Sequence, residues 1–437
     1  MLISLQDTQA LRLHPDDDVV IALMPLAAGR SIDVGDRSVK LTANVEPGHK
    51  IAARAVEVGQ PVRRYGQVIG FATRPIAPGD HVHSHNLAVG DMHLDYQFGT
   101  DLRELPAVEP RTFMGYRRPK GRAGTRNTVA VLGTVNCSAH TVRTIAARAR
   151  AELLPRFPNV TDVIGIAHRS GCATKTTGYE IEMLRRTLAG FARSPNVAAY
   201  LFVGLGCETN QFEDLLNSQQ ALLGDVRLPP YIGIQDSGGV QATIEEGLRE
   251  VERRLAYADQ FAREPIPASE LCLALQCGGS DGFSGITGNP ALGHAVDLLV
   301  AQGGTAVLSE TPEVYGAEHM LTRRAVSRQV GEKLIERIRW WEEYTEREGF
   351  VIDNNPAPGN KAGGLTTIYE KSLGAVAKGG SMPLTAVYEY AEPIVDRGFT
   401  FMDTPGYDPV SATGQVAGGC NIIAFTTGRG SCFGFKP

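Results

Sequence analysis

Short apolar runs and helical stretches alternate through most of the chain from Thr128 onwards, and this alternation constrains the fold more than any other feature. The runs at 128–135 and 160–168 have the composition of buried strands, and the stretches at 140–154 and 179–192 repeat apolar residues at helical spacing. The same alternation continues through strands expected at 197–206, 230–237, 270–277, 305–310, 384–390, 399–406 and 421–430, and through helical regions at 240–263, 291–303 and 319–347. Strands and helices joined by short connections form parallel sheets covered by helices. The pattern therefore predicts an α/β region with mostly parallel sheets.

The first ninety residues follow a different pattern. Apolar runs at 19–24, 39–45 and 68–76 are separated by Gly- and Pro-containing turns, which predicts a small β-rich domain. A polar, Pro-containing stretch follows at about 91–111 and is typical of a linker. The chain has 437 residues, longer than one core of about 250–300 residues supports. We therefore predict a β-rich domain at 1–92, a linker at 93–114, and two α/β catalytic domains at 115–264 and 265–437.

Composition excludes several classes of protein. The formal net charge is −5 and no basic stripe is present, which argues against a nucleic-acid partner. No window of about 18 apolar residues exists and the start lacks a signal-peptide pattern, so we expect neither membrane insertion nor export. Seven cysteines without a CxxC pair fit a reducing cytoplasm. Neither a Walker A motif nor GxGxxG occurs, so no nucleotide cofactor is expected.

A run of histidines closes the β-rich part. If residues 81–85 form a strand, His81, His83 and His85 share one face, because alternate residues of a strand point the same way. Imidazoles at this spacing can bind a transition metal. The alternative interpretation is a solvated polar loop.

The expected strand ends carry many reactive side chains. In open α/β sheets ligands bind at the carboxyl ends of the strands. Six such ends carry Cys, His or carboxylates, several of them beside Gly, which suggests the floor of one site: Asn136–Ser138, His168–Cys172, Gly206–Asn210, Gln235–Ser237, Gln276–Asp281 and Ser309–Glu310. The alternative is that these are polar connections and that each Cys is a small buried hydrophobe.

Two further stretches suit an anion. Residues 355–364 form a Gly- and Asn-rich loop in which backbone amides, Asn360 and Lys361 can converge on a negative group. Thr426, Thr427 and Arg429 near the end of the chain offer hydroxyls and a guanidinium fork suited to a carboxylate. A rigid Pro-Gly connection is the alternative for the first stretch.

These motifs together resemble the altronate/galactarate dehydratase family, over essentially the whole chain. The N-terminal part resembles the family's small SAF-type domain, through Pro47–Lys50, Arg64–Gly66, Ile69–Gly70 and His81–Asn86. The remainder matches at Gly115–Arg117, Gly124–Asn127, Thr134–Cys137, Gly204–Glu208, Gln276–Asp281, Pro358–Lys361 and Phe425–Gly430. The histidine run and Asp403–Asp408 resemble the altronate branch more than the galactarate branch. Members of the family usually continue for some tens of residues beyond the last motif, so a C-terminal segment is expected to be absent from this sequence, which ends at Pro437.

The resemblance implies dehydration of a 2,3-dihydroxy acid of the altronate type to a 2-keto-3-deoxy acid, through abstraction of the C2 proton and loss of the C3 hydroxyl. It also implies a divalent metal acting as Lewis acid, iron(II) in preference to Mn2+ or Mg2+. We predict catalytic roles for His168, Glu208, Asp281 and Lys361, substrate binding by Asn136, Asn360, Thr426, Thr427 and Arg429, and metal ligation by His83, His85, Cys277 and Glu310. No CxxC pair occurs, which favours His and carboxylate ligands over an iron–sulfur cluster, although cysteines from separate strand ends could converge.

Three alternatives stay open. Galactarate could be the substrate, or a sulfolactate-type sulfo-lyase reaction could replace dehydration; such lyases are thought to carry the small domain on a separate chain. A non-catalytic sugar-acid binding protein would keep Lys361 and Arg429 but could lose the metal ligands. We expect a homo-oligomer, a dimer, in which the small domain lies over the strand ends so that the active site forms at the interface.

Overall fold

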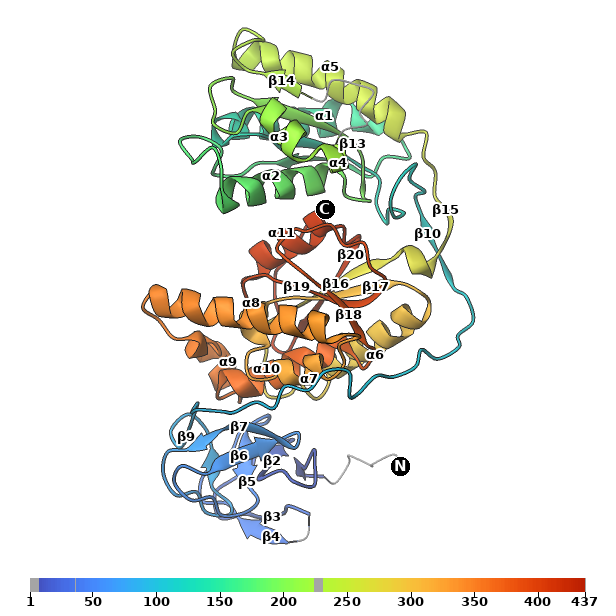
Figure 1. The fold of residues 1–437 in the computed structure, drawn as a ribbon. Helices are drawn as coiled ribbons and strands as arrows, with labels where there is room; N and C mark the ends of the chain where they lie inside the picture. Colours follow the sequence, from blue (N-terminus) through green and yellow to red (C-terminus); the bar gives the residue numbers. More distant parts are fainter. Residues whose placement is uncertain (1–7, 36, 224–230, 437) are drawn as a thin grey trace.

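The computed structural model describes residues 8–35, 37–223 and 231–436. The first seven residues, part of the segment searched for a signal peptide, and Pro230 of one expected strand lie outside these ranges. Figure 1 shows three parts in a row: the β-rich N-terminal domain, the C-terminal α/β domain in the middle, and the other α/β domain at the far end. The order in space therefore differs from the order along the chain. No helix of the described residues is long and apolar enough to cross a membrane.

The N-terminal domain consists of short antiparallel strands, as predicted. One sheet has the order β1 (Ala10–Leu11), β2 (Val19–Ala22), β5 (Lys50–Ala52) and β8 (His81–Val82). A second has the order β6 (Pro61–Arg64), β7 (Gln67–Ala72) and β9 (Leu87–Ala88), and β3 (Ser31–Asp33) pairs with β4 (Ser38–Lys40). The expectation of a strand through His85 was wrong. The strand ends at Val82 because Asn86 closes a turn, accepting from the backbone N of His83 at 2.9 Å and donating its own N–H to the His83 carbonyl at 2.9 Å.

The second domain contains a parallel four-stranded sheet covered on both faces. Its strand order is β12 (Asp162–Ile166), β11 (Thr128–Gly133), β13 (Val197–Gly204) and β14 (Tyr231–Gly233). Val129 and Val131 of β11 pack against α1 (Ala139–Glu152) and α5 (Val240–Ala258). The alternate residues, Ala130 and Leu132, pack towards α2 (Tyr179–Ala192), α3 (Phe212–Ser218) and α4 (Gln220–Leu223). The unbroken apolar run of β11 follows from burial on both faces.

The third domain contains a parallel five-stranded sheet. Its order is β18 (Leu384–Tyr388), β19 (Gly398–Met402), β17 (Thr305–Leu308), β16 (Cys272–Gly278) and β20 (Ile422–Thr427). The helices are α6 (Gly288–Ala301), α7 (Glu318–Thr322), α8 (Arg328–Arg347), α9 (Pro358–Ala362), α10 (Ile368–Val376) and α11 (Asp408–Gly418). The single helical region expected at 319–347 is two helices, because Ser327 caps a new helix by accepting from the backbone N of Val330 at 3.3 Å. The stretch expected to be a loop at 355–364 contains the short helix α9.

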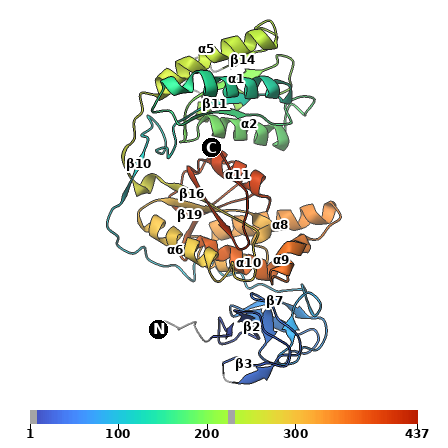
Figure 2. The ribbon, with the colours of Figure 1, turned by 180° about the vertical axis from the view of Figure 1, so that it is seen from behind.

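Several connections hold the described parts together. The expected domain boundary between residues 264 and 265 lies within β15 (Glu264–Pro267), which pairs with β10 (Thr112–Gly115) in an antiparallel ribbon beside the two α/β domains (Figure 1; seen from behind in Figure 2). The linker lies on the third domain, where Tyr96 donates to Glu318 at 2.8 Å. Residues of the N-terminal domain, including Val62, Ile69 and Val82, share one hydrophobic core with Leu373 of α10. The N-terminal domain is therefore packed on the third domain and not on the second.

Candidate functional site

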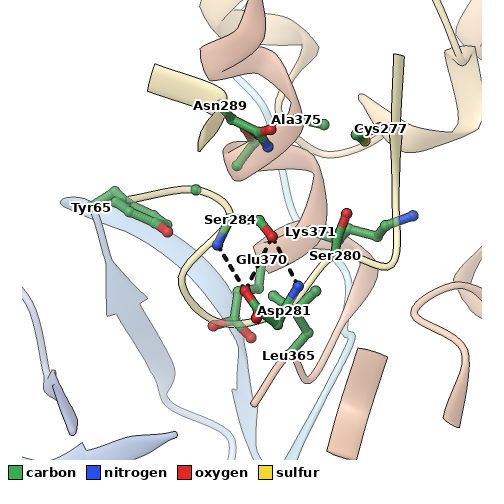
Figure 3. Close-up of a pocket in the computed structure, with 12 residues that line it drawn as sticks. Tyr65, Cys277, Ser280, Asp281, Ser284, Asn289, Leu365, Glu370, Lys371 and Ala375 are labelled. Carbon is green, nitrogen blue, oxygen red and sulfur yellow. Dashed lines mark hydrogen bonds between the residues drawn. The ribbon is translucent and has the colours of Figure 1, made fainter. Parts of the chain in front are cut away.

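The carboxyl edge of the five-stranded sheet faces the N-terminal domain. Strand β16 ends at Gly278 and leads into a turn around Asp281, whose Oδ1 accepts from the backbone N of Phe283 and of Ser284 at 3.0 Å each. Figure 3 shows that this turn, α10 and Tyr65 of the N-terminal domain line one pocket. Asp281 therefore shapes the floor of the pocket through its hydrogen bonds to the backbone.

A buried group that we call the lysine–carboxylate cluster lies beside this turn: Cys277, Glu310, Glu313, Lys371 and Lys378. The Nζ of Lys378 lies 3.0 Å from the Cys277 Sγ and 2.8 Å from the Glu310 Oε2. The Nζ of Lys371 donates to the Glu313 Oε1 at 2.5 Å. The two lysines are seven residues apart, two helical turns, so they extend from one face of α10 and its continuation. The cluster brings two ammonium groups and two carboxylates together away from solvent.

Glu310 has two unusual features within this cluster. Its backbone is left-handed, with φ of 67°, a conformation that non-glycine residues hold only where the surroundings enforce it. Its Oε1 is buried without a hydrogen-bond partner. Strained backbone and an unsatisfied buried oxygen both concentrate at functional sites.

Burial and paired charges shift the ionisation of this cluster. Burial raises the pKa of Glu310 to about 7, against the opposing charge of Lys378, and raises the pKa of the Cys277 thiol to about 11. Burial alone would lower the pKa of Lys378, but Cys277 and Glu310 outweigh it and its pKa is raised. Cys277 is therefore a neutral thiol at neutral pH, and Lys378 is a cation.

A second buried charge group joins the two domains. Glu370 of α10 accepts from the Lys50 Nζ at 2.8 and 2.9 Å, and also pairs with Arg64. The Lys50 Nζ also donates to the Gly364 carbonyl at 2.6 Å, and the Arg64 Nη2 to the Gly282 carbonyl at 2.6 Å. Two cations of the N-terminal domain thus hold both the helix and the Asp281 turn of the third domain in place.

Four imidazoles meet at the same interface, and we call them the histidine cluster: His49, His81, His83 and His85. The ring centroids of His49, His81 and His83 lie 5.1, 5.3 and 5.4 Å apart, and His85 lies 5.5 Å from His81. The Nδ1 of His49 is 3.0 Å from the Nε2 of His81, and the Nε2 of His83 is 2.9 Å from the Lys361 carbonyl. The turn that ends β8 gathers the rings although no single strand face presents them.

Burial lowers the pKa of all four histidines, and that of His81, which also senses His49 and His83, falls to about 3. Neutral imidazoles keep ring lone pairs and are the form that binds transition metals. The histidine cluster therefore fits a divalent transition metal by the chemistry of its donors, but no three of its rings offer nitrogens that all lie within 4.8 Å of one another, so the rings must turn to converge on one ion.

A second set of possible metal donors lies in the lysine–carboxylate cluster. Cys277, Glu310 and Glu313 are the only three His, Cys, Asp or Glu side chains of the described residues whose ligand atoms all lie within 4.8 Å of one another. Two ammonium groups already balance the two carboxylates, so an added cation would raise the buried charge. His83 and His85 do not belong to this set, so the four predicted ligands divide between two places.

The predicted anion-binding residues lie at the same edge. The Nη1 of Arg429 donates to the Gly359 carbonyl at 2.9 Å, and the Nδ2 of Asn360 donates to the Ser280 carbonyl at 2.8 Å. Thr426 donates to the Asn289 Oδ1 at 2.7 Å, and Thr427 Oγ1 accepts from the backbone N of Gly430 at 3.0 Å. Lys361 belongs to α9, next to His83 through its carbonyl.

The other three predicted residues lie elsewhere. Asn136, His168 and Glu208 belong to the carboxyl edge of the four-stranded sheet of the second domain. Both views place that domain at the far end from the N-terminal domain. The single floor expected from six strand ends is therefore divided between two sheets, because the strands that carry them do not pair with one another.

Several site residues were not predicted from the sequence. Lys371, Lys378 and Glu370 lie in or directly after a helix, without the Gly-rich context that marked the other candidates. Glu313 follows Glu310 at a spacing that a short helical turn brings together, which is a signal that could have found it. His49 and Lys50 lay inside a motif used for the resemblance, without an assigned role.

The fold and the site define an α/β enzyme whose N-terminal β domain brings histidines to the strand ends of a parallel sheet. Three family models match successive parts of the chain: the altronate/galactarate dehydratase SAF domain at 8–90, the D-galactarate dehydratase/altronate hydrolase second domain at 115–259, and the D-galactarate/altronate dehydratase C-terminal domain at 268–437. The chain therefore belongs to the altronate/galactarate dehydratase family and is a hydro-lyase.

Individual relatives agree with this assignment. An altronate dehydratase of Bacillus subtilis (strain 168) is 37% identical over 438 residues, covering 98% of this chain and 85% of the relative. A galactarate dehydratase (L-threo-forming) of Escherichia coli (strain K12) is 36% identical and covers 97% of this chain and 82% of the relative. A (2R)-sulfolactate sulfo-lyase subunit beta of Chromohalobacter salexigens is 32% identical and covers 75% of this chain and 80% of the relative.

Proposed function

We propose that this chain dehydrates an altronate-type aldonate to a 2-keto-3-deoxy acid at the interface between its N-terminal and third domains. The observation that carries the proposal is the lysine–carboxylate cluster, buried at the carboxyl edge of a parallel sheet where such folds bind ligands. The histidine cluster faces the same edge, through the contact of His83 with the carbonyl of Lys361. A base, an acid and positive charge are the three requirements of the reaction, and all are present here.

The chemistry follows from the charges of these side chains. Removal of the C2 proton beside a carboxylate develops negative charge, which buried ammonium groups such as those of Lys371 and Lys378 stabilise more strongly than water does. Glu310 and Glu313 are the carboxylates placed to accept and return protons, a contribution of about 10²–10⁴-fold. Arg429, Asn360, Thr426, Thr427 and Lys361 are assigned to hold the substrate's carboxylate and hydroxyls, with Asp281 shaping the floor.

His49, His81 and His83 are the residues that would hold a divalent metal, iron(II) in preference, with His85 beside them. The bound ion would supply Lewis acidity towards the substrate's carboxylate and hydroxyl oxygens. We further propose that the protein is cytoplasmic and forms a homodimer. Light scattering of the purified chain would test the dimer.

The test is a substrate panel with the full chain, purified with ferrous iron and supplied with altronate, galactarate or sulfolactate. Formation of the 2-keto-3-deoxy product from altronate at the highest kcat/KM is expected. A kcat/KM for galactarate similar to that for altronate would make the substrate assignment wrong. The galactarate dehydratase relative is nearly as similar to this chain as the altronate dehydratase relative. Sulfite release from sulfolactate would place the chain with the sulfo-lyases.

The metal assignment has its own test. His49→Ala and His83→Ala should each lose most of the protein-bound iron that exceeds the acid-labile sulfide content. Each should also lower kcat by at least about 100-fold, because a lost metal ligand removes the Lewis acid. The matched control is His140→Ala, an exposed histidine in the second domain, which should retain both. Full metal content and turnover in the first two variants would rule out the histidine cluster.

A further inference from the structure

Three cysteines gather at the carboxyl edge of the second domain's sheet. Cys137 follows β11, Cys172 lies beyond β12, and Cys207 follows β13. Strands β12 and β13 both pair with β11 in parallel, so the three carboxyl ends are neighbours. All three thiols are exposed and free, while Cys432, the remaining exposed cysteine, lies in the C-terminal segment.

Backbone contacts fix the three cysteine-bearing loops against one another. The backbone N of Asn136 donates to the Ser170 carbonyl at 2.9 Å, which ties the first loop to the second. The backbone N of Asn210 donates to the Gly171 carbonyl at 3.0 Å, which ties the third loop to the second. Gly171 has φ of +91°, and a Cβ there would lie 2.5 Å from the carbonyl oxygen of Thr134, so only glycine permits this approach. The close gathering is therefore built into the backbone.

The two ionisable residues predicted at this edge besides the cysteines, Glu208 and His168, are already engaged in hydrogen bonds. Glu208 is buried and accepts from the Thr134 hydroxyl at 2.8 Å and from the backbone N of Gly206 at 2.6 Å, so both of its oxygens are engaged. The Nε2 of His168 is 3.0 Å from the Gly133 carbonyl, and its Nδ1 accepts from the backbone N of Ser170 at 3.1 Å. Both residues therefore brace the loops, and the three thiols beside them are exposed.

The three thiols lie at neighbouring strand ends but do not converge on one point. The pKa of Cys137 is raised by desolvation and by Cys172, with smaller effects from Cys207 and Glu208, which identifies these groups as its neighbours. The ligand atoms of Cys137, Cys172 and Cys207 do not all lie within 4.8 Å of one another. Among the described residues, only Cys277, Glu310 and Glu313 meet that criterion. A single tetrahedral ion, with metal–sulfur distances of about 2.3 Å, needs sulfurs closer together than this.

We propose that Cys137, Cys172 and Cys207 bind a 4Fe–4S cluster through three thiolates at the strand ends of the second domain. Thiolates are the ligands that iron–sulfur clusters take, and a cluster spans more widely spaced sulfurs than one ion does. Each thiol gives up its proton to solvent on binding, and two ferrous ions, two ferric ions and four sulfides supply the cluster atoms without any further oxidant. Three thiolates leave one iron without a cysteine, and this iron is open to an oxygen ligand such as a hydroxy acid. The site is separate from the histidine cluster and does not depend on the proposed function.

The test is anaerobic reconstitution of the full chain with equal amounts of ferrous and ferric iron and with sulfide, followed by assay of iron, acid-labile sulfide and visible absorption. Wild-type protein should hold about four sulfides per chain. Cys137→Ser, Cys172→Ser and Cys207→Ser should each lose most of that sulfide, whereas Cys432→Ser, the matched exposed control, should retain it. The replaced thiols are exposed, so the thermal unfolding midpoints should stay close to wild type.

Two outcomes would overturn the cluster. Wild-type protein without acid-labile sulfide after reconstitution would do so, whether it bound zinc, one iron or nothing. Equal sulfide in Cys172→Ser and Cys432→Ser would do so as well. The histidine variants separate this proposal from the proposed function: His49→Ala should retain the sulfide and lose only the iron bound without it.

Discussion

Glu370 is the one anion between two buried cations, and its replacement gives the sharpest test of how the domains are joined. Lys50, Arg64 and Glu370 are all fully enclosed, and each cation comes from the N-terminal domain while the carboxylate comes from α10. Glu370→Gln keeps the size of the side chain and removes its charge. Lys50 and Arg64 would then face each other in the interior without a counter-ion.

The size of the effect can be worked from the distances. At 2.8 Å and an effective dielectric constant of about 20, the Lys50–Glu370 attraction is about 6 kcal/mol, part of which offsets the cost of desolvation. Removing one partner of a buried pair costs about 3–5 kcal/mol, and Glu370→Gln should fall in this range. Lys50→Met should cost less, because it leaves Arg64 and Glu370 as a neutral pair.

The assay is urea unfolding of the full chain, combined with limited proteolysis that reports release of the N-terminal domain. The control is Glu152→Gln, which removes an exposed partner of Arg148 on α1 and should leave the unfolding transition close to that of the wild type. A transition for Glu370→Gln that coincides with that of Glu152→Gln would refute the reasoning. A larger loss from Lys50→Met than from Glu370→Gln would refute the charge argument in particular.

The pairing of Glu370 with Lys50 and Arg64 predicts that the free energy of unfolding depends on pH. Burial would raise the pKa of Glu370, but Lys50 and Arg64 outweigh it and lower the pKa from 4.5 to about 2. A carboxylate whose pKa is lowered by folding stabilises the protein above its unfolded pKa and loses that contribution as the pH falls. A shift of this size corresponds to about 3 kcal/mol. The difference in unfolding free energy between wild type and Glu370→Gln should therefore narrow as the pH falls from 4.5 towards 2.

Two substitutions test the proposed active site by steady-state kinetics. Arg429→Lys should raise KM for the sugar acid about tenfold, since lysine lacks the guanidinium fork, and an unchanged KM and kcat would remove Arg429 from the site. Lys378→Met should lower kcat by at least about 100-fold with KM little changed, because it removes an ammonium group assigned to stabilise the developing negative charge. The fold should persist, because Glu310, whose pKa is already raised to about 7, can take a proton. A wild-type kcat would contradict the role of Lys378.

The alternation of strands and helices was enough to predict the class of fold, because local patterns report burial. The helix expected at 179–192 is α2 with the same bounds. The histidine run shows where such patterns stop: alternation favoured a strand through His85, and the turn arises because the Asn86 side chain accepts from the backbone of His83. Spacing alone does not record a competing hydrogen bond between a side chain and the backbone.

The candidate site was predictable only where its residues lie in Gly-rich turns. Asp281, Asn360 and Arg429 do lie together at the predicted strand ends. Lys371 and Lys378 look like ordinary helix residues, and their burial follows from packing against Cys277, Glu310 and Glu313, which lie 58 to 101 positions earlier in the chain. The division of the strand ends between two sheets is likewise a matter of pairing across long sequence separations, which periodicity does not encode.

The two parallel sheets present different donors at the same structural position. The edge beneath the N-terminal domain offers imidazoles, carboxylates and ammonium groups, which suit divalent ions and anionic oxygen. The edge of the second domain offers three thiols. The neighbouring carboxylate of Glu208 and imidazole of His168 are engaged in hydrogen bonds with the Thr134 hydroxyl and the Gly133 carbonyl. Thiolates and oxygen donors select different metals, so the two sites need not compete for one ion. Because the N-terminal domain docks on the third domain alone, the thiol edge stays exposed, and a cluster bound there would have one iron facing outwards, where an oxygen ligand or another surface can reach it.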